Sequence, residues 1–488
     1  MKRVSNPLIM NDMKKIYIMI MLVLAGTMAM AQTSVWHGGR AVWTRGTGTE
    51  SDPFLLESAD NLAYLAYVVN KGYDTRDIYF RLTTDIDLNG SEDLQWTPIG
   101  CGIGGMWFSE DGCYRGNPGY PFTGFPSFNG HFDGGEHSIS NIYIDNSESI
   151  YGYYIGLFGM AEGVSEGQEV YPAVIENVFV TSGYLKGVYC GGIVGDGRST
   201  TLISRCWNGA TIETVVGDDN YLIHGYIGGI VGRDAYQVKN CYNVGDVSGY
   251  YAGGIVGYGN AVIEECYNEG DINGTFAGGI YGYSMRNKVI INNCYNQGSV
   301  YADGSVSGNA PAGPAAGGIA SFFFKGTSSI TNCYNVGAVT STKDVGCILA
   351  YGPEVVLENN YYINTCDAGG EGTPQTEEVM QSPAFVDLLN GQNEEHVWAM
   401  DVNHTNGGFP ILTTIDLAVP EIIEATFNVY PNPAQGRFTV EGRGRMTVSN
   451  LLGQVVLVKE IDGQATVALP RGMYFVKLGN ETRKIVVE

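Results

Sequence analysis

The sequence predicts an all-β protein: a right-handed parallel β-helix solenoid with short helical end caps, followed by a small C-terminal β-sandwich. The motif Cys-Tyr-Asn recurs five times, with Trp replacing Tyr in the first copy, and Gly-Gly-Ile recurs at matching distances. The shortest spacing between copies is 25 residues, with Ile or Val at fixed offsets. This period is typical of one solenoid coil per repeat, because a coil buries its apolar face only against neighbouring coils. The 69 glycines and 32 tyrosines also favour turn-rich β-structure.

Residues 1–31 have the pattern of a signal peptide. Lys14 and Lys15 precede an apolar run, and an Ala-x-Ala site ends at Ala31. The run is too short to span a bilayer, so we expect cleavage after Ala31 and no transmembrane segment in the mature protein.

Residues 32–136 are predicted to form an N-terminal cap. Ser58 can cap a helix in which an apolar face at i, i+3, i+4 and i+7 would cover the first coil; this face comprises Leu62, Leu65, Ala66 and Val69. Asp85 to Gly90 matches the first half of a calcium loop, but Trp96 stands where that loop needs Glu. We favour a strand that ends in an Asn-Gly turn. Export permits a disulfide between Cys101 and Cys113.

Residues 137–370 are predicted to form the β-helix, with eight rungs. Side chains of a strand alternate between its faces, which places the Cys position inside and the following aromatic outside. The predicted outer column consists of Tyr143, Phe179, Trp207, Tyr242, Tyr267, Tyr295, Tyr334 and Tyr361. It is either a stabilising stack or a track for a ligand, since Tyr and Trp combine apolar faces with polar edges. The candidate ligand-binding residues are Trp207, Tyr242, Tyr267, Tyr295 and Tyr334.

The repeated Cys, Gly and Asn residues are predicted to be structural. No Cys-x-x-Cys pair or histidine cluster accompanies the cysteines, and Ile or Val fills the column elsewhere, so we expect a buried core position with no metal and no cofactor. The Gly pairs suit tight corners. The Asn side chains can hydrogen bond to one another along the stack.

Two long insertions leave the same corner of the predicted coil, near residues 215–226 and 303–316. Loops on a rigid scaffold commonly carry function. Their few polar residues do not define a reaction.

Catalysis finds little support in the sequence. No two of the six histidines have the spacing of a zinc peptidase motif. Asp246 and Asp271 occupy equal positions on adjacent rungs and could act as paired carboxylates, although two solvated turn residues are the simpler interpretation.

Residues 371–412 are predicted to form a C-terminal cap. Thr376 can cap a helix that runs to about Leu389, with Val379, Phe385 and Leu388 on its apolar side, and this helix would cover the last coil. Residues 413–425 are expected to be a linker.

The run Gly156-Leu157-Phe158-Gly159 and the later Gly-Gly-Ile-Val-Gly copies resemble the GLUG motif of bacterial surface proteins and some immunoglobulin A peptidases. This resemblance implies a β-helix-like surface protein and supplies no catalytic residues to transfer.

Residues 426–488 alternate as short strands and predict the β-sandwich. They resemble the C-terminal sorting domain of type IX secretion substrates. The resemblance rests on several motifs in order, with the key positions Tyr430, Pro431, Asn432, Pro433, Gly472, Tyr474 and Lys484. It implies a partner in the outer-membrane secretion machinery and a route through the periplasm to the outer-membrane surface or the medium.

The formal net charge of −24 argues against nucleic acid and anionic membranes as partners. We therefore expect a non-catalytic scaffold for adhesion or ligand binding, with glycans or host and cell-surface proteins as candidate partners. The alternative is a β-helical polysaccharide lyase or hydrolase.

Overall fold

The computed structural model describes residues 33–100, 106–109, 112–115, 126–146, 154–166, 169–214, 225–285, 288–304, 313–391, 396–413, 428–430, 434–450, 455–478 and 481–487. The chain divides into two compact units, residues 1–415 and 416–488. The predicted cleavage site at Ala31, the pairing of Cys101 with Cys113, and the predicted motif residues Pro431, Asn432 and Pro433 lie outside the described residues.

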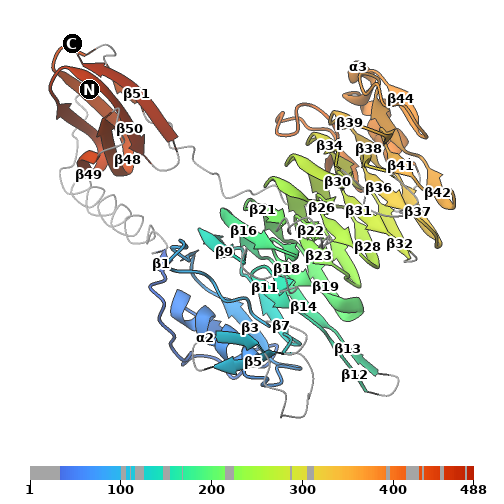
Figure 1. Cartoon of the computed structure of the whole chain (residues 1–488), viewed down its shortest axis with the longest axis horizontal. Coiled ribbons are helices and arrows are strands. Elements are labelled where there is room, and N and C mark those ends of the chain that lie inside the picture. The colour runs from blue at the N-terminus through green and yellow to red at the C-terminus, as the bar shows by residue number, and fades with distance from the viewer. Residues whose placement is uncertain are drawn as a thin grey trace, which may run out of the picture. The chain divides into compact units, whose positions relative to one another are not determined.

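The first unit contains a parallel β-helix, as predicted, in which successive coils contribute strands to four parallel sheets (Figure 1). The coil that follows residue 260 shows the pattern. Its strands are β28 (Ala261–Glu264), β29 (Tyr267–Asn268), β30 (Ile272–Gly278) and β31 (Tyr281–Ser284), and we call the sheets that contain them sheets 1, 2, 3 and 4. Equivalent residues of successive coils pair in parallel register, for example Tyr267 with Tyr295.

The other strands repeat this order along the chain. Sheet 1 also holds β2 (Phe54–Leu56), β3 (Tyr79–Leu82), β7 (His131–Asp133), β14 (Ala173–Glu176), β19 (Thr201–Ser204), β24 (Gln237–Lys239), β32 (Val289–Asn292), β37 (Ser328–Thr331) and β42 (Val355–Glu358). Sheet 2 also holds β1 (Ser34–Val35), β4 (Ile86–Asp87), β8 (Ser138–Ser140), β15 (Phe179–Val180), β20 (Trp207–Asn208), β25 (Tyr242–Asn243), β33 (Tyr295–Asn296), β38 (Tyr334–Asn335), β43 (Tyr361–Ile363) and β44 (Thr373–Gln375).

Sheet 3 consists of two strand halves that are continuous only in β26 (Val247–Gly253) and β30. Its other strands are β9 (Ile142–Asp145), β10 (Tyr154–Ile155), β16 (Gly183–Gly187), β17 (Tyr189–Gly191), β21 (Thr211–Thr214), β22 (Tyr226–Gly228), β34 (Val300–Ala302), β35 (Ala315–Gly317), β39 (Val339–Ser341) and β40 (Asp344–Gly346). Both predicted insertions separate such halves, although most of their residues lie outside the described ones.

Sheet 4 also holds β11 (Phe158–Met160), β18 (Val194–Asp196), β23 (Val231–Arg233), β27 (Val256–Tyr258), β36 (Ala320–Phe323) and β41 (Leu349–Tyr351). The other strands of this unit form the hairpins β5 (Met106–Ser109) with β6 (Gly112–Arg115), β12 (Val164–Glu166) with β13 (Glu169–Tyr171), and β45 (Trp398–Ala399) with β46 (Ile411–Leu412). A short helix, η1 (Arg198–Thr200), follows β18.

The core lies inside the coils and is continuous along the solenoid. Ile263 of sheet 1, Cys266 beside sheet 2, Ile272 of sheet 3 and Ile280 before sheet 4 are all fully buried. The inward assignment of the Ile and Cys positions is therefore confirmed. Each coil closes around its own apolar residues, and neighbouring coils cover them above and below.

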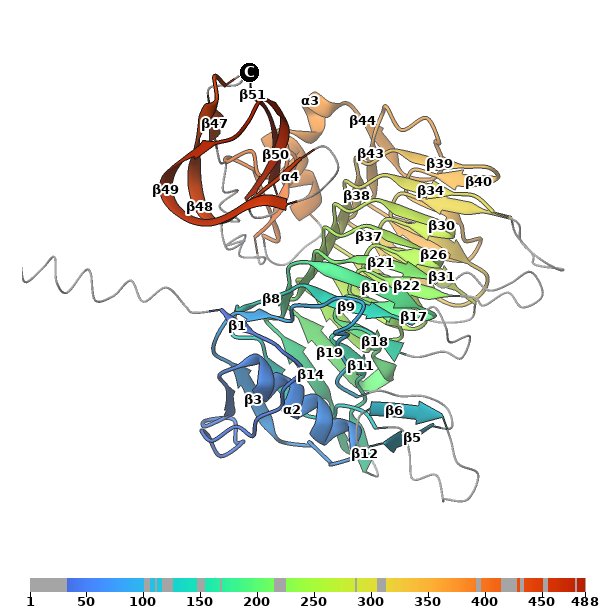
Figure 2. The same cartoon turned by 60° about the vertical axis from the view of Figure 1, so that its left-hand side comes forward.

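The N-terminal region begins the solenoid earlier than the predicted boundary at residue 137. Strands β1 to β4 and β7 already belong to sheets 1 and 2. The helix α2 (Ala59–Asn70) lies at this end (Figure 2), and Ser58 caps it, accepting the Asn61 N–H at 3.2 Å. The predicted apolar face is buried, which confirms the helix and its orientation.

The predicted register of the first rungs is wrong by about one strand. Tyr143 was expected beside Phe179, but it belongs to sheet 3 and pairs with Tyr184, whereas Phe179 pairs with Ser138 of sheet 2. Strands of both sheets alternate apolar and polar residues here, so alternation alone could not tell which sheet each strand joins.

The C-terminal cap contains two helices, α3 (Glu377–Met380) and α4 (Pro383–Asn390), instead of the single predicted one. The break lies at Pro383, which has no backbone N–H to donate, and Ser382 caps the second helix by accepting the Phe385 N–H. Phe385 is buried as predicted, but Val379 and Leu388 are exposed.

The helices lie against the side of the last coils and do not cover their end. The ring centroids of Phe385 in α4 and Tyr334 in β38 lie 6.1 Å apart, and those of Phe385 and Tyr361 lie 5.1 Å apart. A disulfide between Cys347 and Cys366 instead fixes the loop after β43 against the last coil, and both cysteines are buried with the core.

The second unit is a small antiparallel β-structure. It contains β47 (Asn428–Tyr430), β48 (Arg437–Asn450), β49 (Val455–Ala468), β50 (Gly472–Leu478) and β51 (Glu481–Val487). The long strands β48 and β49 pair along most of their length, and β48 also pairs with β47 and β50. Its own core includes Phe438, Val448 and Ile485, as expected for a separate domain.

Candidate functional site

Each coil turns from sheet 1 into sheet 2 at the residue before the Cys position. From Asn177 to Asn359 this residue has φ between 49° and 55°, a left-handed conformation in which Asn is favoured among side-chain-bearing residues. Arg205 and Glu265 replace Asn in two coils. The backbone of each coil therefore bends at the residue before the Cys position.

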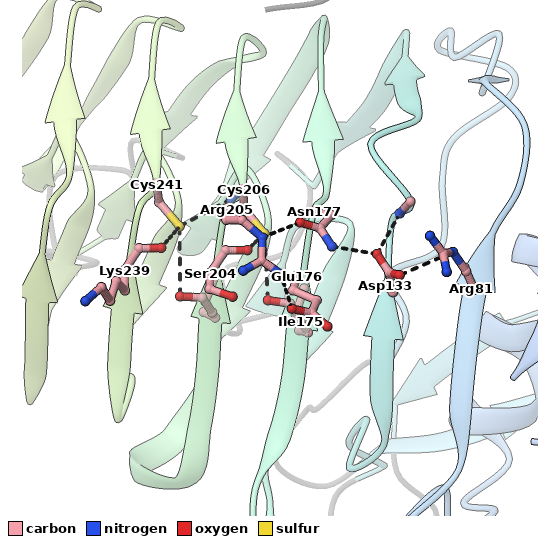
Figure 3. Close-up of polar contacts among 12 residues, drawn as sticks. Arg81, Asp133, Ile175, Glu176, Asn177, Ser204, Arg205, Cys206, Lys239 and Cys241 are labelled. Carbon is pink, nitrogen blue, oxygen red and sulfur yellow. Dashed lines mark hydrogen bonds and ion pairs between the residues drawn. The ribbon is translucent and has the colours of Figure 1, made fainter. Parts of the chain in front are cut away.

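The residues at this bend between sheets 1 and 2 take part in a series of polar contacts on the outside of the first coils (Figure 3). Arg205 Nε donates to Asn177 Oδ1 at 2.6 Å, and Asn177 Nδ2 donates to Asp133 Oδ1 at 2.7 Å. Arg81 pairs with the same carboxylate at 3.3 Å. These polar contacts link adjacent coils and use both carboxylate oxygens of Asp133. We therefore assign Asp133 a structural role.

The cysteine column is part of the core. The Cys241 thiol donates to the Lys239 carbonyl at 3.2 Å, and its sulfur accepts the Cys206 backbone N–H at 3.4 Å (Figure 3). Burial raises the pKa of the Cys206 and Cys333 thiols, whereas for Cys241 and Cys294 the effect of burial is outweighed by hydrogen bonds from neighbouring cysteines, which lower the thiol pKa. Within the described ranges no three His, Cys, Asp or Glu side chains form a group suited to a metal.

Buried asparagines form a ladder beside the cysteines. Asn243 Nδ2 donates to Asn268 Oδ1, and Asn268 Nδ2 donates to Asn296 Oδ1, each at 2.8 Å. The second Gly of each Gly-Gly pair faces this ladder. A Cβ on Gly254 would lie 2.5 Å from Asn268 Cγ, which is too close for any side chain. The predicted stacking of Asn amides is thus confirmed, and Gly is required to accommodate it.

The predicted ligand-binding column is buried. The rings of Trp207, Tyr242, Tyr267, Tyr295 and Tyr334 stack nearly in parallel with centroids 4.7 to 5.5 Å apart. We call these five residues the sealed column. The exposed fractions of these five side chains are only 0 to 8%. We expected an open aromatic track, whereas the structure shows a covered one. Ligand binding by these residues stays a prediction.

The C-terminal segment covers the last part of the sealed column. The Trp398 ring lies 6.1 Å from that of Tyr295 and 5.5 Å from that of Tyr334. The Tyr334 hydroxyl donates to the Pro410 carbonyl at 2.6 Å and accepts from Asn406 Nδ2 at 3.0 Å. A ligand could reach these two rings only if this segment moved away.

A second aromatic assembly lies at the Gly-Gly corner between sheets 3 and 4. We call it the corner strip. Its residues on sheet 3 are Tyr154, Tyr189, Tyr226, Tyr251 and Phe276, and those on sheet 4 are Tyr258, Tyr283, Phe322 and Tyr351.

Rings of the two sheets meet across the corner. The centroids of Tyr226 and Tyr258 lie 4.3 Å apart, as do those of Tyr251 and Tyr283. Glycine permits this approach, since a Cβ on Gly253 would lie 2.0 Å from the Val256 carbonyl oxygen. Rings in the middle of the strip are buried, whereas Tyr154, Tyr189, Tyr226 and Tyr258 are half-buried and Tyr351 is 40% exposed.

The sequence contained a signal for the corner strip that our interpretation did not use. An aromatic residue stands two positions before the Gly-Gly pair at Tyr189, Tyr226, Tyr251 and Phe276. A second one follows the Gly-Gly-Ile-x-Gly run at Tyr258. Both positions keep the repeat spacing, so an alignment on Gly-Gly would have revealed two further aromatic columns.

Charged residues replace the aromatic ones of sheet 4 at the N-terminal end of the strip. Arg233 pairs with Tyr258 in the ladder, and Asp196 pairs with Arg233. Asp196 is fully buried, and its Oδ2 lies 3.4 Å from Arg198 Nε and 3.9 Å from Arg233 Nη1. Burial raises the pKa of the Asp196 carboxyl to about 6, against the opposing effect of the two arginines.

The other acidic candidates make backbone contacts. Asp246 Oδ1 accepts the Asp271 N–H at 3.1 Å, and Asp271 Oδ1 accepts the Ser299 N–H at 3.0 Å. Each carboxylate therefore caps the next coil. In the partial calcium pattern, Asp87 Oδ1 accepts the Asn89 N–H at 2.7 Å, which fits the predicted turn.

The sorting-motif residues lie on the strands of the second unit. Tyr430 ends β47 and is 43% exposed, whereas Tyr474 of β50 is almost buried. Gly472 begins β50, and Lys484 pairs with Phe475 between β50 and β51.

Comparison with known families confirms both resemblances. Residues 428–488 match the secretion system C-terminal sorting domain, and residues 248–273 match the GLUG motif. The chain thus contains a GLUG motif and a C-terminal sorting domain of type IX secretion. The latter marks it for secretion to the cell surface or the extracellular space.

Individual relatives are more distant. A provisionally named Gly-rich membrane protein of Evansella cellulosilytica is 30% identical over 130 residues, which make up 26% of this chain and 12% of that protein. This chain thus spans a small part of that relative. A crystal structure of a provisionally named immunoglobulin A1 protease from Bacteroides ovatus superposes with a TM-score of 0.40 at 20% identity, over 76% of this chain and 95% of the other. Across the described ranges, we find no helix with the length and apolar character needed to cross a bilayer.

Proposed function

We propose that this secreted β-helix protein binds glycans through the corner strip and is not an enzyme. The observation that carries the proposal is the run of half-buried aromatic rings from Tyr154 to Tyr258 on a rigid repeat scaffold. Sugar rings pack their C–H faces on aromatic side chains, and Tyr adds a hydroxyl at the edge of the ring. Exposed aromatic surface of this kind commonly marks a binding site.

The strip suits an extended ligand. Its rings repeat once per coil, and successive coils of a parallel sheet lie about 4.8 Å apart. Several neighbouring sugar units of a chain could therefore contact the protein together, and weak single contacts would add up along the strip. A host or bacterial surface glycan would give the protein an adhesive role.

The test is a glycan and host-protein array with the full secreted chain and its Tyr189→Ala and Tyr258→Ala variants. We expect the wild-type protein to retain glycans and both variants to lose about fivefold or more in affinity, since one aromatic contact contributes about 1 kcal/mol or more. The matched control is Tyr236→Ala, because Tyr236 is 61% exposed and stands outside the strip. Binding that survives both strip variants would refute the proposal.

A polysaccharide lyase or hydrolase is the second candidate. It is favoured by Asp196, a buried carboxyl with a pKa near 6 beside two arginines. Incubation with mixed polysaccharides should release neither reducing ends nor unsaturated uronic acids if the protein only binds. Release that disappears in Asp196→Asn would replace our proposal with this one.

A further inference from the structure

The N-terminal end of the corner strip differs from the rest in its chemistry. Sheet 4 contributes Asp196 and Arg233 here, where later coils contribute aromatic rings. Sheet 3 continues to contribute tyrosines on the opposite side, and the rings of Tyr189 and Tyr226 stack with centroids 5.1 Å apart. The strip therefore changes along its length from two aromatic columns to one aromatic column that faces charged groups.

The Asp196 carboxylate is incompletely satisfied. Its Oδ1 accepts the Arg198 backbone N–H at 3.0 Å, but its buried Oδ2 accepts no hydrogen bond within the described part of the chain. The nearest guanidinium nitrogens stand off at 3.4 and 3.9 Å. A buried carboxylate in this state is costly, and such groups concentrate at functional sites.

Arg233 connects this carboxylate with the surface. Its Nε approaches Asp234 Oδ2 at 3.2 Å, its Nη1 faces Asp196, and 31% of its side chain is exposed. A guanidinium carries five N–H donors in a fixed plane, so two acidic neighbours need not use all of them. Its exposed part lies at the end of the strip.

The charges of this group balance. Asp196 and Asp234 oppose Arg198 and Arg233, which leaves no net charge when all four are ionised. The whole chain carries a net charge of −24. An anionic glycan would thus meet no excess of positive charge here and would be repelled by the remainder of the protein.

We propose that Arg233 forms an end subsite for a neutral glycan, donating hydrogen bonds to sugar oxygens while neighbouring sugar units pack on Tyr189 and Tyr226. Asp196 is a positioning residue, because its charge lies 3.9 Å from Arg233 Nη1 and attracts the guanidinium. This inference rests on the proposed function and adds the class of ligand. Asp196 contacts no ligand, because its oxygens are buried behind the two arginines.

The test uses the full secreted chain and isothermal titration with cellohexaose, mannohexaose and xylohexaose as neutral probes and hexagalacturonate as the acidic one. We expect at least one neutral probe to bind more tightly than the acidic probe. Arg233→Gln should raise the Kd of the neutral probe by about tenfold or more, as expected for a lost hydrogen bond to a charged group. The control Lys239→Gln removes a cation from sheet 1 of the following coil and should leave the Kd unchanged.

The positioning role of Asp196 is tested by pH. Asp196→Asn should weaken glycan binding several-fold and at the same time raise the Tm. A carboxylate with a purely structural role would not combine weaker binding with higher stability when it is replaced. Wild-type affinity should fall between pH 7.5 and pH 5 as Asp196 takes up a proton, and the variant should lose this dependence. The groups that face Asp196 are Arg198, Arg233 and Asp234, with the phenols of Tyr154 and Tyr189 across the corner.

The outcomes separate the two proposals. If wild type binds, Tyr189→Ala abolishes binding and Arg233→Gln does not affect it, the strip is the site but the end subsite is wrong. Tighter binding of hexagalacturonate than of every neutral probe would overturn the ligand class. If wild type binds none of the probes and no glycan in the array, both proposals fail.

Discussion

The sealed column and the corner strip are built from the same residue types with the same repeat spacing, yet they have opposite surroundings. In the sealed column each ring stacks on its neighbours within one sheet, and its exposed fraction does not exceed 8%. In the corner strip, rings from two sheets meet across a glycine turn, and several of them are only partly buried. Aromatic spacing alone therefore does not distinguish packing from recognition. A ring that other side chains cover can only stabilise the fold, whereas a ring that stays partly exposed can also bind a ligand.

The cover of the sealed column comes from a distant part of the chain. Trp398 reaches Tyr295 and Tyr334 across a large separation in sequence. In the described part of the chain, no comparable tryptophan packs on the corner strip. This contrast can be tested residue by residue, beginning with the cover itself.

The largest effect is expected for Trp398→Ala. The side chain is 2% exposed, contacts two rings of the sealed column, and donates from Nε1 to Asn293 Oδ1 at 3.3 Å. Loss of such a buried aromatic residue should lower the free energy of unfolding by about 3–5 kcal/mol. Chemical denaturation followed by tryptophan fluorescence or circular dichroism measures it. Val402→Ala is the matched control in the same segment, because Val402 is 78% exposed and should contribute almost nothing. Equal stability of the two variants would mean that the segment does not seal the column.

The second-largest effect is a gain in the free energy of unfolding, and it is expected for Asp196 at the end of the corner strip. The pKa of Asp196 rises from its usual 3.8 to about 6, so ionisation at pH 7 destabilises the folded state. At 1.36 kcal/mol per pKa unit, Asp196→Asn should stabilise the protein at pH 7 by up to about 3 kcal/mol. The advantage should shrink as the pH falls through about 6 and disappear only below about pH 3, where wild-type Asp196 is protonated in both the folded and the unfolded state. Unfolding measured across this pH range checks the prediction, and a pH-independent gain would contradict it.

A smaller effect distinguishes two tyrosines inside the sealed column. Tyr334→Phe removes a hydroxyl that bonds to the Pro410 carbonyl and to Asn406, and should cost about 1–2 kcal/mol. Tyr295→Phe should be nearly neutral, since its hydroxyl makes no hydrogen bond within the described residues, although its ring is equally buried. Equal melting temperatures for both variants would show that the C-terminal segment is held by ring packing alone.

The smallest effect is expected at the open end of the corner strip. The ring of Tyr351 stacks on that of Phe322 at 4.7 Å but is 40% exposed, so Tyr351→Ala should cost about 1 kcal/mol or less. Tyr361→Ala, which removes a ring packed against Phe385, should cost at least twice as much. Thermal unfolding of the pair provides the comparison, and a larger loss at Tyr351 would reverse our assignment of the open side.

Most of the fold could be predicted from the sequence because the repeat encodes it locally. Cys266, Ile263 and Ile272 are all buried as their spacing indicated, and the bend before each Cys follows from the tolerance of Asn for positive φ. The first rungs were harder. Tyr143 lies in an alternating strand that fits either sheet, and its true neighbour Tyr184 stands outside the repeat motif.

The candidate site could be predicted only in part. Whether Tyr295 faces solvent depends on Trp398, whose position results from tertiary packing that no periodic pattern records. The unusual state of Asp196 likewise depends on burial by two arginines, one of which lies on the next coil. In contrast, the corner strip was encoded in the repeat and required only an alignment centred on Gly-Gly.

The hydrogen bonds of the asparagine ladder show how coils can be added to the solenoid and where the series ends. Each interior Asn accepts an amide proton from one neighbouring coil and donates one to the other, so the two faces of a coil are complementary and one more copy could be inserted without mismatched amides. The series stops after Asn335, where Tyr362 takes the next position. In the coil that contains Asn335, Cys347 replaces the second Gly of the pair and forms its disulfide with Cys366, in the loop after β43. The solenoid thus ends with a disulfide bond at the place where the asparagine ladder stops.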